Sequence, residues 1–271
     1  MTAPNISNPT HPTAAMNQVR LPRTAALGPG LGGQPRLLID APAGAAEIYL
    51  HGATLTSWVP RGGSEVIFTS RQAVFDGSTA IRGGIPLCLP EFGVGINGDA
   101  VPKHGWARIA PWQLRMVAST DDGGVRALLS VSRNHLTALY EVEIGETLRL
   151  GLSLRNDGNA PRTVEAAAHT YLSVHDVTAS LISGLAGASY SDNLAHSPQE
   201  AHRVQDGDVR ISGPVDRIYD SAELVTVTDP GHERTIHVDK RNAPSTIVWN
   251  PWSTYSAPLP DMADDEFPTM V

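Results

Sequence analysis

One stretch of the chain limits its possible folds more than any other, because its apolar residues alternate with polar or small ones. Leu148, Leu150, Leu152 and Leu154 are each separated by a single such residue. Successive side chains of a β-strand point to opposite faces of the sheet. The alternation therefore predicts a strand that carries all four leucines on one face.

The residues before this stretch continue the β pattern. Tyr140, Val142 and Ile144 alternate with glutamates, and Gly145 separates the two runs, which predicts a hairpin or one long bulged strand. Turn residues lie between many further apolar runs, and no segment has a sustained helical period. Together with 21 prolines, this predicts an all-β fold, an antiparallel β-sandwich or barrel. Shorter strands are predicted at residues 46–50, 55–59, 125–132, 163–169, 224–228 and 234–238.

A length of 271 residues suits a single all-β domain. Residues 1–34 are rich in proline and glycine and poor in apolar residues, which predicts a flexible N-terminal tail. Residues 35–271 are then expected to form one β-sandwich domain.

The net charge of −8 argues against a nucleic-acid-binding protein, which usually carries an excess of basic residues. This net charge is compatible with an anionic small-molecule substrate, because a few converging arginines suffice to bind one. A single cysteine, Cys88, excludes an internal disulfide. There is no membrane-length apolar run and no signal peptide, so we expect a cytoplasmic monomer without a membrane partner.

Two apparent motifs carry no function. Residues 28–33 match the glycine pattern of dinucleotide-binding proteins, but that motif needs a strand before it and a helix after it, and Pro35 follows inside the predicted tail. A flexible linker is the preferred interpretation. His232 and His237 lack the spacing and the carboxylates of a zinc site, so no metal is expected.

Three segments carry residues that suit chemistry. In residues 81–90, Arg82 precedes two glycines, which would let the backbone approach a ligand while the guanidinium reaches out; a solvated arginine at a turn is equally compatible. In residues 102–108, an extended strand would place His104, Trp106 and Arg108 on one face, as in a sugar-binding surface. The alternative there is a core tryptophan flanked by exposed charges.

The third segment, residues 165–172, contains His169 at the end of a run of small residues. A histidine at a strand end facing a cavity is a suitable general acid, because its pKa lies near working pH. The alternative is a core histidine that its neighbours satisfy.

Taken together and in order, these segments resemble the hexose-6-phosphate 1-epimerases (mutarotases) of the aldose 1-epimerase superfamily. The resemblance runs from about residue 36 to the end of the chain. It implies a β-sandwich of the galactose-mutarotase-like type, with no metal and no organic cofactor. The matching blocks are residues 81–86 (Ile-Arg-Gly-Gly-Ile-Pro), 103–108, 169–171 (His-Thr-Tyr), 216–219, 249–252 (Trp-Asn-Pro-Trp) and 262–270.

The resemblance also implies roles for individual residues. His169 matches the family's catalytic histidine, the general acid that protonates the sugar ring oxygen. Arg82, Arg108 and Asp216 match substrate-binding positions, and the arginines would hold the 6-phosphate of a sugar phosphate. Two further substrate-binding positions are Lys103, where the family has glutamine, and His104, where the superfamily has a second histidine.

The family's catalytic glutamate follows the segment that here ends at Val271. We therefore expect the chain to be cut short at its C-terminus, with the partner glutamate beyond Val271. The predicted function is interconversion of the α and β anomers of a hexose 6-phosphate. The expected substrate is glucose 6-phosphate. The alternative is an inactive sugar-phosphate-binding or interaction module on the same fold.

Overall fold

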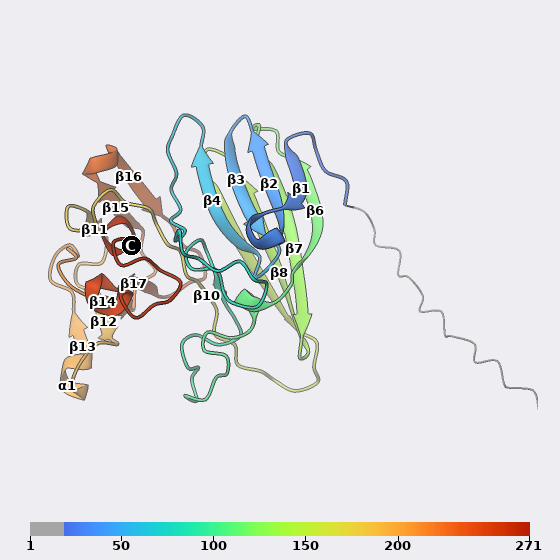
Figure 1. Ribbon diagram of the computed structural model, residues 1–271. Helices are drawn as coiled ribbons and strands as arrows, with labels where there is room; N and C mark the ends of the chain where they lie inside the picture. Colours follow the sequence, from blue (N-terminus) through green and yellow to red (C-terminus); the bar gives the residue numbers. More distant parts are fainter. Residues whose placement is uncertain (1–18) are drawn as a thin grey trace, which may run out of the picture.

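The structure is a computed structural model that describes residues 19–271, and it consists almost entirely of antiparallel β-strands (Figure 1). Strands make up 41% of the described residues and helices 8%. These proportions, and the antiparallel pairing within every sheet, confirm the predicted all-β fold.

Two four-stranded sheets form the larger part of the molecule (Figure 1). Their strand orders are β1-β2-β3-β4 and β6-β7-β8-β9, and the inner faces of both sheets supply the largest apolar core. Burial of apolar surface between the sheets stabilises this sandwich. The strands are β1 (Ala25–Pro29), β2 (Pro35–Ala41), β3 (Gly44–Tyr49), β4 (Thr54–Pro60), β6 (Gln113–Ser119), β7 (Val125–Arg133), β8 (Leu136–Ile144) and β9 (Leu148–Asn156).

Strands β8 and β9 form the predicted hairpin and not one long strand. Their register places Tyr140 opposite Leu152 and Val142 opposite Leu150. The two alternating runs therefore share one face of the sheet, where cross-strand apolar pairs stabilise the hairpin.

The C-terminal part of the chain forms two smaller sheets that enclose a second apolar core. Figure 1 shows them beside the larger sandwich, with strand orders β13-β12-β14-β17 and β11-β15-β16. The strands are β11 (Leu181–Ser183), β12 (Ser189–Asp192), β13 (His202–Val204), β14 (Val215–Tyr219), β15 (Val225–Asp229), β16 (Arg234–Val238) and β17 (Thr246–Asn250).

The helices of the described residues are short, and none is long and apolar enough to cross a membrane. The α-helices are α1 (Pro198–Ala201) and α2 (Trp252–Ser256). Single turns of 3-10 helix occur at η1 (Leu31–Gly33), η2 (Ala107–Ile109), η3 (Pro230–His232) and η4 (Phe267–Thr269).

A two-stranded pair, β5 (Leu87–Cys88) and β10 (Ala167–Ala168), brings residues 84–90 and 165–171 side by side. The strand predicted at residues 163–169 is therefore mostly wrong. Its partner segment contains Pro86 and Pro90, which have no backbone N–H to donate to a ladder. The pairing continues only through single bonds, such as His169 N–H to the Pro86 carbonyl at 3.0 Å.

The predicted N-terminal tail is wrong for the part that the structure describes, and residues 1–18 lie outside the described residues. Strand β1 pairs with β2 along its whole length, from Ala25↔Ile39 to Pro29↔Pro35. An edge strand with one partner needs few apolar residues, so composition did not reveal it. Residues 28–33 thus join two strands, which confirms that they are no dinucleotide motif but contradicts a flexible linker. That residues 35–271 form a single domain stays a prediction.

A buried carboxylate ties the C-terminal segment to the loop after residue 69. Glu266 is 6% exposed and accepts hydrogen bonds from the Ser70 hydroxyl at 2.7 Å and from the backbone N–H groups of Arg71 and Ala263, both at 2.9 Å. Bonds to a charged acceptor are stronger than neutral ones. Glu266 therefore fixes the course of the residues that precede Val271.

We predict that Glu266→Gln lowers the free energy of unfolding by about 1–3 kcal/mol, because in either orientation the new NH2 group faces one of the two backbone N–H groups that now donate to Glu266. Urea unfolding followed by fluorescence measures the loss. The matched control, Asp264→Asn at an exposed neighbouring position, should change stability by less than about 0.5 kcal/mol. Equal stability of the two variants would contradict the role of Glu266.

Candidate active site

Arg82 is held in a fixed position next to the β5–β10 pair. Its Nε donates to Asp261 Oδ1 at 3.1 Å, and one terminal nitrogen donates to the Tyr171 hydroxyl at 3.1 Å. Burial by itself would lower the pKa of Arg82, but Tyr171 and Asp261 together raise it. The following glycine approaches protein backbone and not open space, since a Cβ on Gly83 would lie 2.5 Å from the Phe68 carbonyl oxygen. The predicted approach of that glycine to a ligand is therefore wrong.

The segment with His104, Trp106 and Arg108 is not the extended strand that the sequence suggested. His104 and Gly105 have φ angles of 67° and 70°, and the 3-10 turn η2 follows directly. Gly105 is required there, because a Cβ would lie 2.2 Å from the Leu89 carbonyl oxygen. Trp106 is 5% exposed and belongs to the large apolar core, so the core interpretation holds and the sugar-stacking one is wrong.

The proton on the His104 ring is placed by a backbone contact. The Gly93 N–H donates to His104 Nδ1 at 3.1 Å, so Nδ1 is the acceptor and Nε2 carries the hydrogen of the neutral ring. Burial lowers the pKa of His104 to about 3, and the positive charge of Arg108 adds to the effect. His104 is thus a neutral hydrogen-bond donor at neutral pH.

His169 follows β10 directly and lies among aromatic rings. Its ring stacks on Tyr171 at 4.8 Å between centroids, and the rings of Trp249 and His104 lie edge-on at 5.7 and 6.4 Å. Part of its surface remains accessible. Burial, together with the positive charges of Arg108 and Arg82, lowers the pKa of His169 to about 4. The expectation of a pKa near neutral is therefore wrong for the protein by itself.

Arg108 brings a second guanidinium to this region. One of its terminal nitrogens donates to the Lys103 carbonyl at 3.0 Å. Burial lowers the pKa of Arg108, and the positive charge of Arg82 adds to the lowering. The two arginines, 26 positions apart in the sequence, are therefore close enough to repel each other. Such a pair favours an anion between or beside the two side chains.

Asp216 reaches the same region from the smaller sheets. It lies on β14, pairs with Trp249 on β17, and accepts a hydrogen bond from Asn193 Nδ2 at 3.0 Å. Burial raises the pKa of Asp216. The exposed Lys103 acts electrostatically on both Asp216 and His104. The structure thus gathers the six predicted site residues in one neighbourhood, at the junction of the two parts of the fold.

Three further residues of this neighbourhood were not assigned a role from the sequence. Tyr171 and Trp249 flank His169, and both stand in blocks that matched the family, which was the available signal. Asp261 forms an ion pair with Arg82, which lies 179 positions earlier in the chain. The residues around Asp261 form no pattern that indicates this role. Within residues 19–271, no group of three His, Cys, Asp or Glu side chains is arranged to hold a metal ion.

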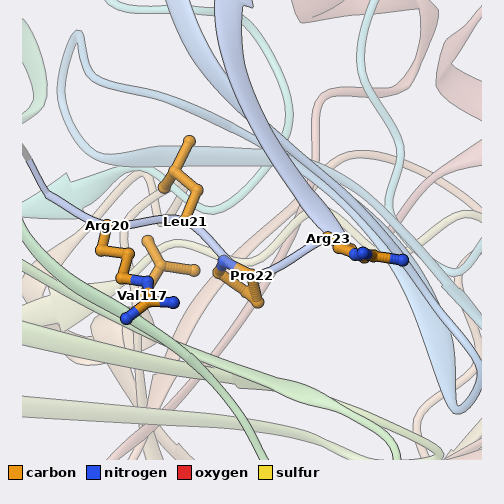
Figure 2. A pocket seen from close by; sticks show the side chains of 5 residues that line it. All are labelled: Arg20, Leu21, Pro22, Arg23 and Val117. Carbon is orange, nitrogen blue, oxygen red and sulfur yellow. The ribbon is translucent and has the colours of Figure 1, made fainter.

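A separate hollow of about 360 Å³ lies where the N-terminal segment crosses strand β6. Figure 2 shows the Arg20 side chain beside Val117, with Arg23 directed away from it. None of the predicted site residues lines this hollow. It is therefore not the site that the sequence predicted.

Comparison with known proteins decides the family. The family model described as aldose 1-epimerase matches residues 35–271. The chain belongs to the aldose 1-epimerase family. A relative from Cenchrus ciliaris, named "Putative glucose-6-phosphate 1-epimerase", is 31% identical over 83% of this chain and 73% of its own length. The predicted family resemblance is thereby confirmed.

Solved structures of the epimerase family agree with the fold. YeaD from Salmonella typhimurium, described as a "putative mutarotase", has a TM-score of 0.84 and 28% identity, covering 93% of this chain and 85% of its own. A galactose mutarotase-like protein from Clostridium acetobutylicum has a TM-score of 0.69 at 11% identity, covering 91% and 86%. The predicted galactose-mutarotase-like sandwich is confirmed. Neither these structures nor the plant relative support an inactive binding module.

We predict that stability falls as the pH falls from about 6.5 to 5. An unfolded histidine has a pKa near 6.5, whereas the folded values are about 4 for His169 and about 3 for His104. In that window the unfolded chain binds more protons, so the free energy of unfolding decreases as the pH falls. The stabilisation that the two neutral histidines contribute is fully present above pH 6.5.

Urea unfolding at pH 7.5, 6.5, 5.5 and 5.0 measures this dependence. His104→Gln should reduce the slope of stability against pH, because the variant lacks one of the two histidines whose pKa is lowered on folding. His135→Gln, at an exposed position in the turn between β7 and β8, is the matched control and should keep the wild-type slope. A wild-type curve that is flat between pH 7.5 and 5.0 would contradict the neutral histidine pair.

Proposed function

We propose that this protein interconverts the α and β anomers of a hexose 6-phosphate, with glucose 6-phosphate as its preferred substrate. One observation carries the proposal: two arginines that repel each other lie beside a histidine that is not fully buried. Arginines suit the phosphate, and the histidine suits proton transfer to the sugar. The names of the relatives support the same substrate.

The reaction needs an acid at the ring oxygen and a base at the C1 hydroxyl of the sugar. His169 gives a proton to the ring oxygen as the C1–O5 bond breaks, while a carboxylate takes the proton of the C1 hydroxyl. Rotation about C1–C2 and reclosure on the other face reverse both transfers. The family resemblance implies a glutamate as the carboxylate, and that glutamate stays a prediction. Each such group contributes roughly 10²–10⁴ in rate.

The other site residues position the sugar. Arg82 and Arg108 hold the phosphate through charge-assisted hydrogen bonds. His104 offers its Nε2–H to a sugar oxygen, because Nδ1 is already occupied by the Gly93 N–H. Asp216 accepts from sugar hydroxyls while Asn193 orients it, and Lys103 lies at the exposed rim. A monomer in the cytoplasm, without cofactor, nucleic-acid or membrane partners, stays a prediction.

We predict that Arg108→Ala weakens glucose 6-phosphate binding by about 10-fold to 100-fold, the effect of losing a hydrogen bond to a charged group. Binding of glucose should change by less than about threefold. Isothermal titration calorimetry measures both ligands. Arg108 is preferred over Arg82 because removing Arg82 would leave the buried Asp261 without its ion pair. The control is Arg61→Ala, an exposed arginine in the loop after β4. Equal losses for both sugars would show that Arg108 does not bind the phosphate.

We predict that His169→Asn lowers anomer exchange of glucose 6-phosphate by about 10²-fold or more, because the variant has no group to protonate the ring oxygen. Exchange between anomeric NMR signals in the full-length protein measures the rate. Phosphate affinity and the thermal melt should stay near wild type. An unchanged rate with a normal melt removes His169 from the mechanism, and a collapsed melt supports the core-histidine interpretation.

A further inference from the structure

The charges around His169 are of one sign. Of the residues that the structure describes, the two charged groups that act on its ring are Arg108 in η2 and Arg82 before β5, and both are positive. The other groups that face the ring are uncharged at neutral pH: Tyr171 after β10, Trp249 on β17, and His104 before η2.

The nearby acidic groups are engaged elsewhere. Asp261 forms an ion pair with Arg82 at 3.1 Å, and Asp216 accepts from Asn193 at 3.0 Å. Arg82 is also joined to His169 through Tyr171, whose hydroxyl accepts from the guanidinium while its ring stacks on the imidazole. A change of charge at Arg82 therefore acts on His169 over a short, largely buried path, where electrostatic interactions are stronger than in water.

This arrangement opposes the acid role of His169. With a pKa of about 4, only about one ring in a thousand is protonated at pH 7. The proposed reaction needs that proton, so the protein by itself is in the wrong protonation state. Burial is the main cause of the low pKa of His169, and the two arginines add to it. A doubly charged phosphate beside both guanidiniums would offset the part that the arginines contribute, because an opposite charge favours the protonated ring.

We propose that a phosphate bound by Arg82 and Arg108 increases the protonated fraction of His169, so that a phosphorylated sugar favours the acid form that opens its own ring. The inference rests on the proposed function. The proton comes from solvent when the phosphate binds, passes from His169 to the ring oxygen on opening, and returns to His169 on reclosure. Binding and protonation are reciprocal, so phosphate affinity rises as the pH falls toward the pKa of His169.

The coupling makes the two arginines determinants of specificity in the chemical step as well as in binding. A free hexose that fills the sugar subsite brings no negative charge to the two guanidiniums, and His169 stays neutral. Free sugars are therefore converted slowly even at saturation. A site whose arginines only anchored the substrate would show a difference in KM and none in kcat.

The test is an NMR titration of the His169 imidazole in the full-length protein, with the signal assigned from the His169→Asn variant. Four samples are compared: protein alone, and protein saturated with inorganic phosphate, with glucose 6-phosphate or with glucose. We expect both phosphates to raise the pKa of His169 by at least about 1, a tenfold change in the protonated fraction. Glucose should leave it unchanged.

Variants separate the charge effect from a general effect of binding. Arg108→Gln should raise the pKa of His169 in the protein alone and reduce the response to phosphate. Arg61→Gln, the matched exposed control, should change neither. Binding of each ligand is verified by calorimetry on the same samples.

Outcomes for the inference and for the proposed function are distinct. The inference is overturned if the pKa of His169 does not move at saturation with glucose 6-phosphate, or if glucose moves it equally. A His169 pKa that responds to inorganic phosphate, in a protein that leaves glucose 6-phosphate anomers unexchanged, supports the coupling and contradicts the proposed function. Rapid exchange with an unmoved pKa contradicts the inference alone.

Discussion

The site depends on the backbone register between residues 84–90 and 165–171. The β5–β10 pair, the bond from His169 N–H to Pro86 and the bond from Tyr171 N–H to the Gly84 carbonyl at 2.9 Å fix this register. It sets Arg82, two residues before the first segment, against Tyr171 at the end of the second. A slip by one residue would turn the side chains of one segment to the opposite face and separate Arg82 from its phenol partner. The contact between Arg82 and Tyr171, and through it the position of Arg82 beside His169, follows from this short pairing.

The local charge of the site is opposite to that of the whole molecule. Although the chain carries a net charge of −8, Arg82, Arg108 and Lys103 converge around two neutral histidines. Because the first two guanidiniums are largely buried, salt screens them less than surface charges. The site therefore attracts an anion at short range, while the net negative charge of the whole chain opposes its approach from a distance.

The sequence predicted those elements whose pattern is local. The alternation in β8 and β9 gave the hairpin and its inner face, and the family blocks gave the six site residues that the structure gathers. Prediction from the sequence failed where contacts between residues far apart in the chain decide the local structure. Strand β1 depends on β2, the short β10 depends on prolines in its partner segment, and Trp106 is buried because His104 and Gly105 turn the chain. Asp261 could not be predicted, since only folding brings it to Arg82.

The C-terminal segment serves two parts of the molecule at once. Asp261 orients Arg82, and five positions later Glu266 is bound to Ser70 and Arg71. For protein engineering, this means that substrate preference and folding stability are not independent traits in residues 261–266. A library that diversifies this segment to change the sugar will discard many variants as unfolded, and compensating changes belong at Ser70, which donates to Glu266.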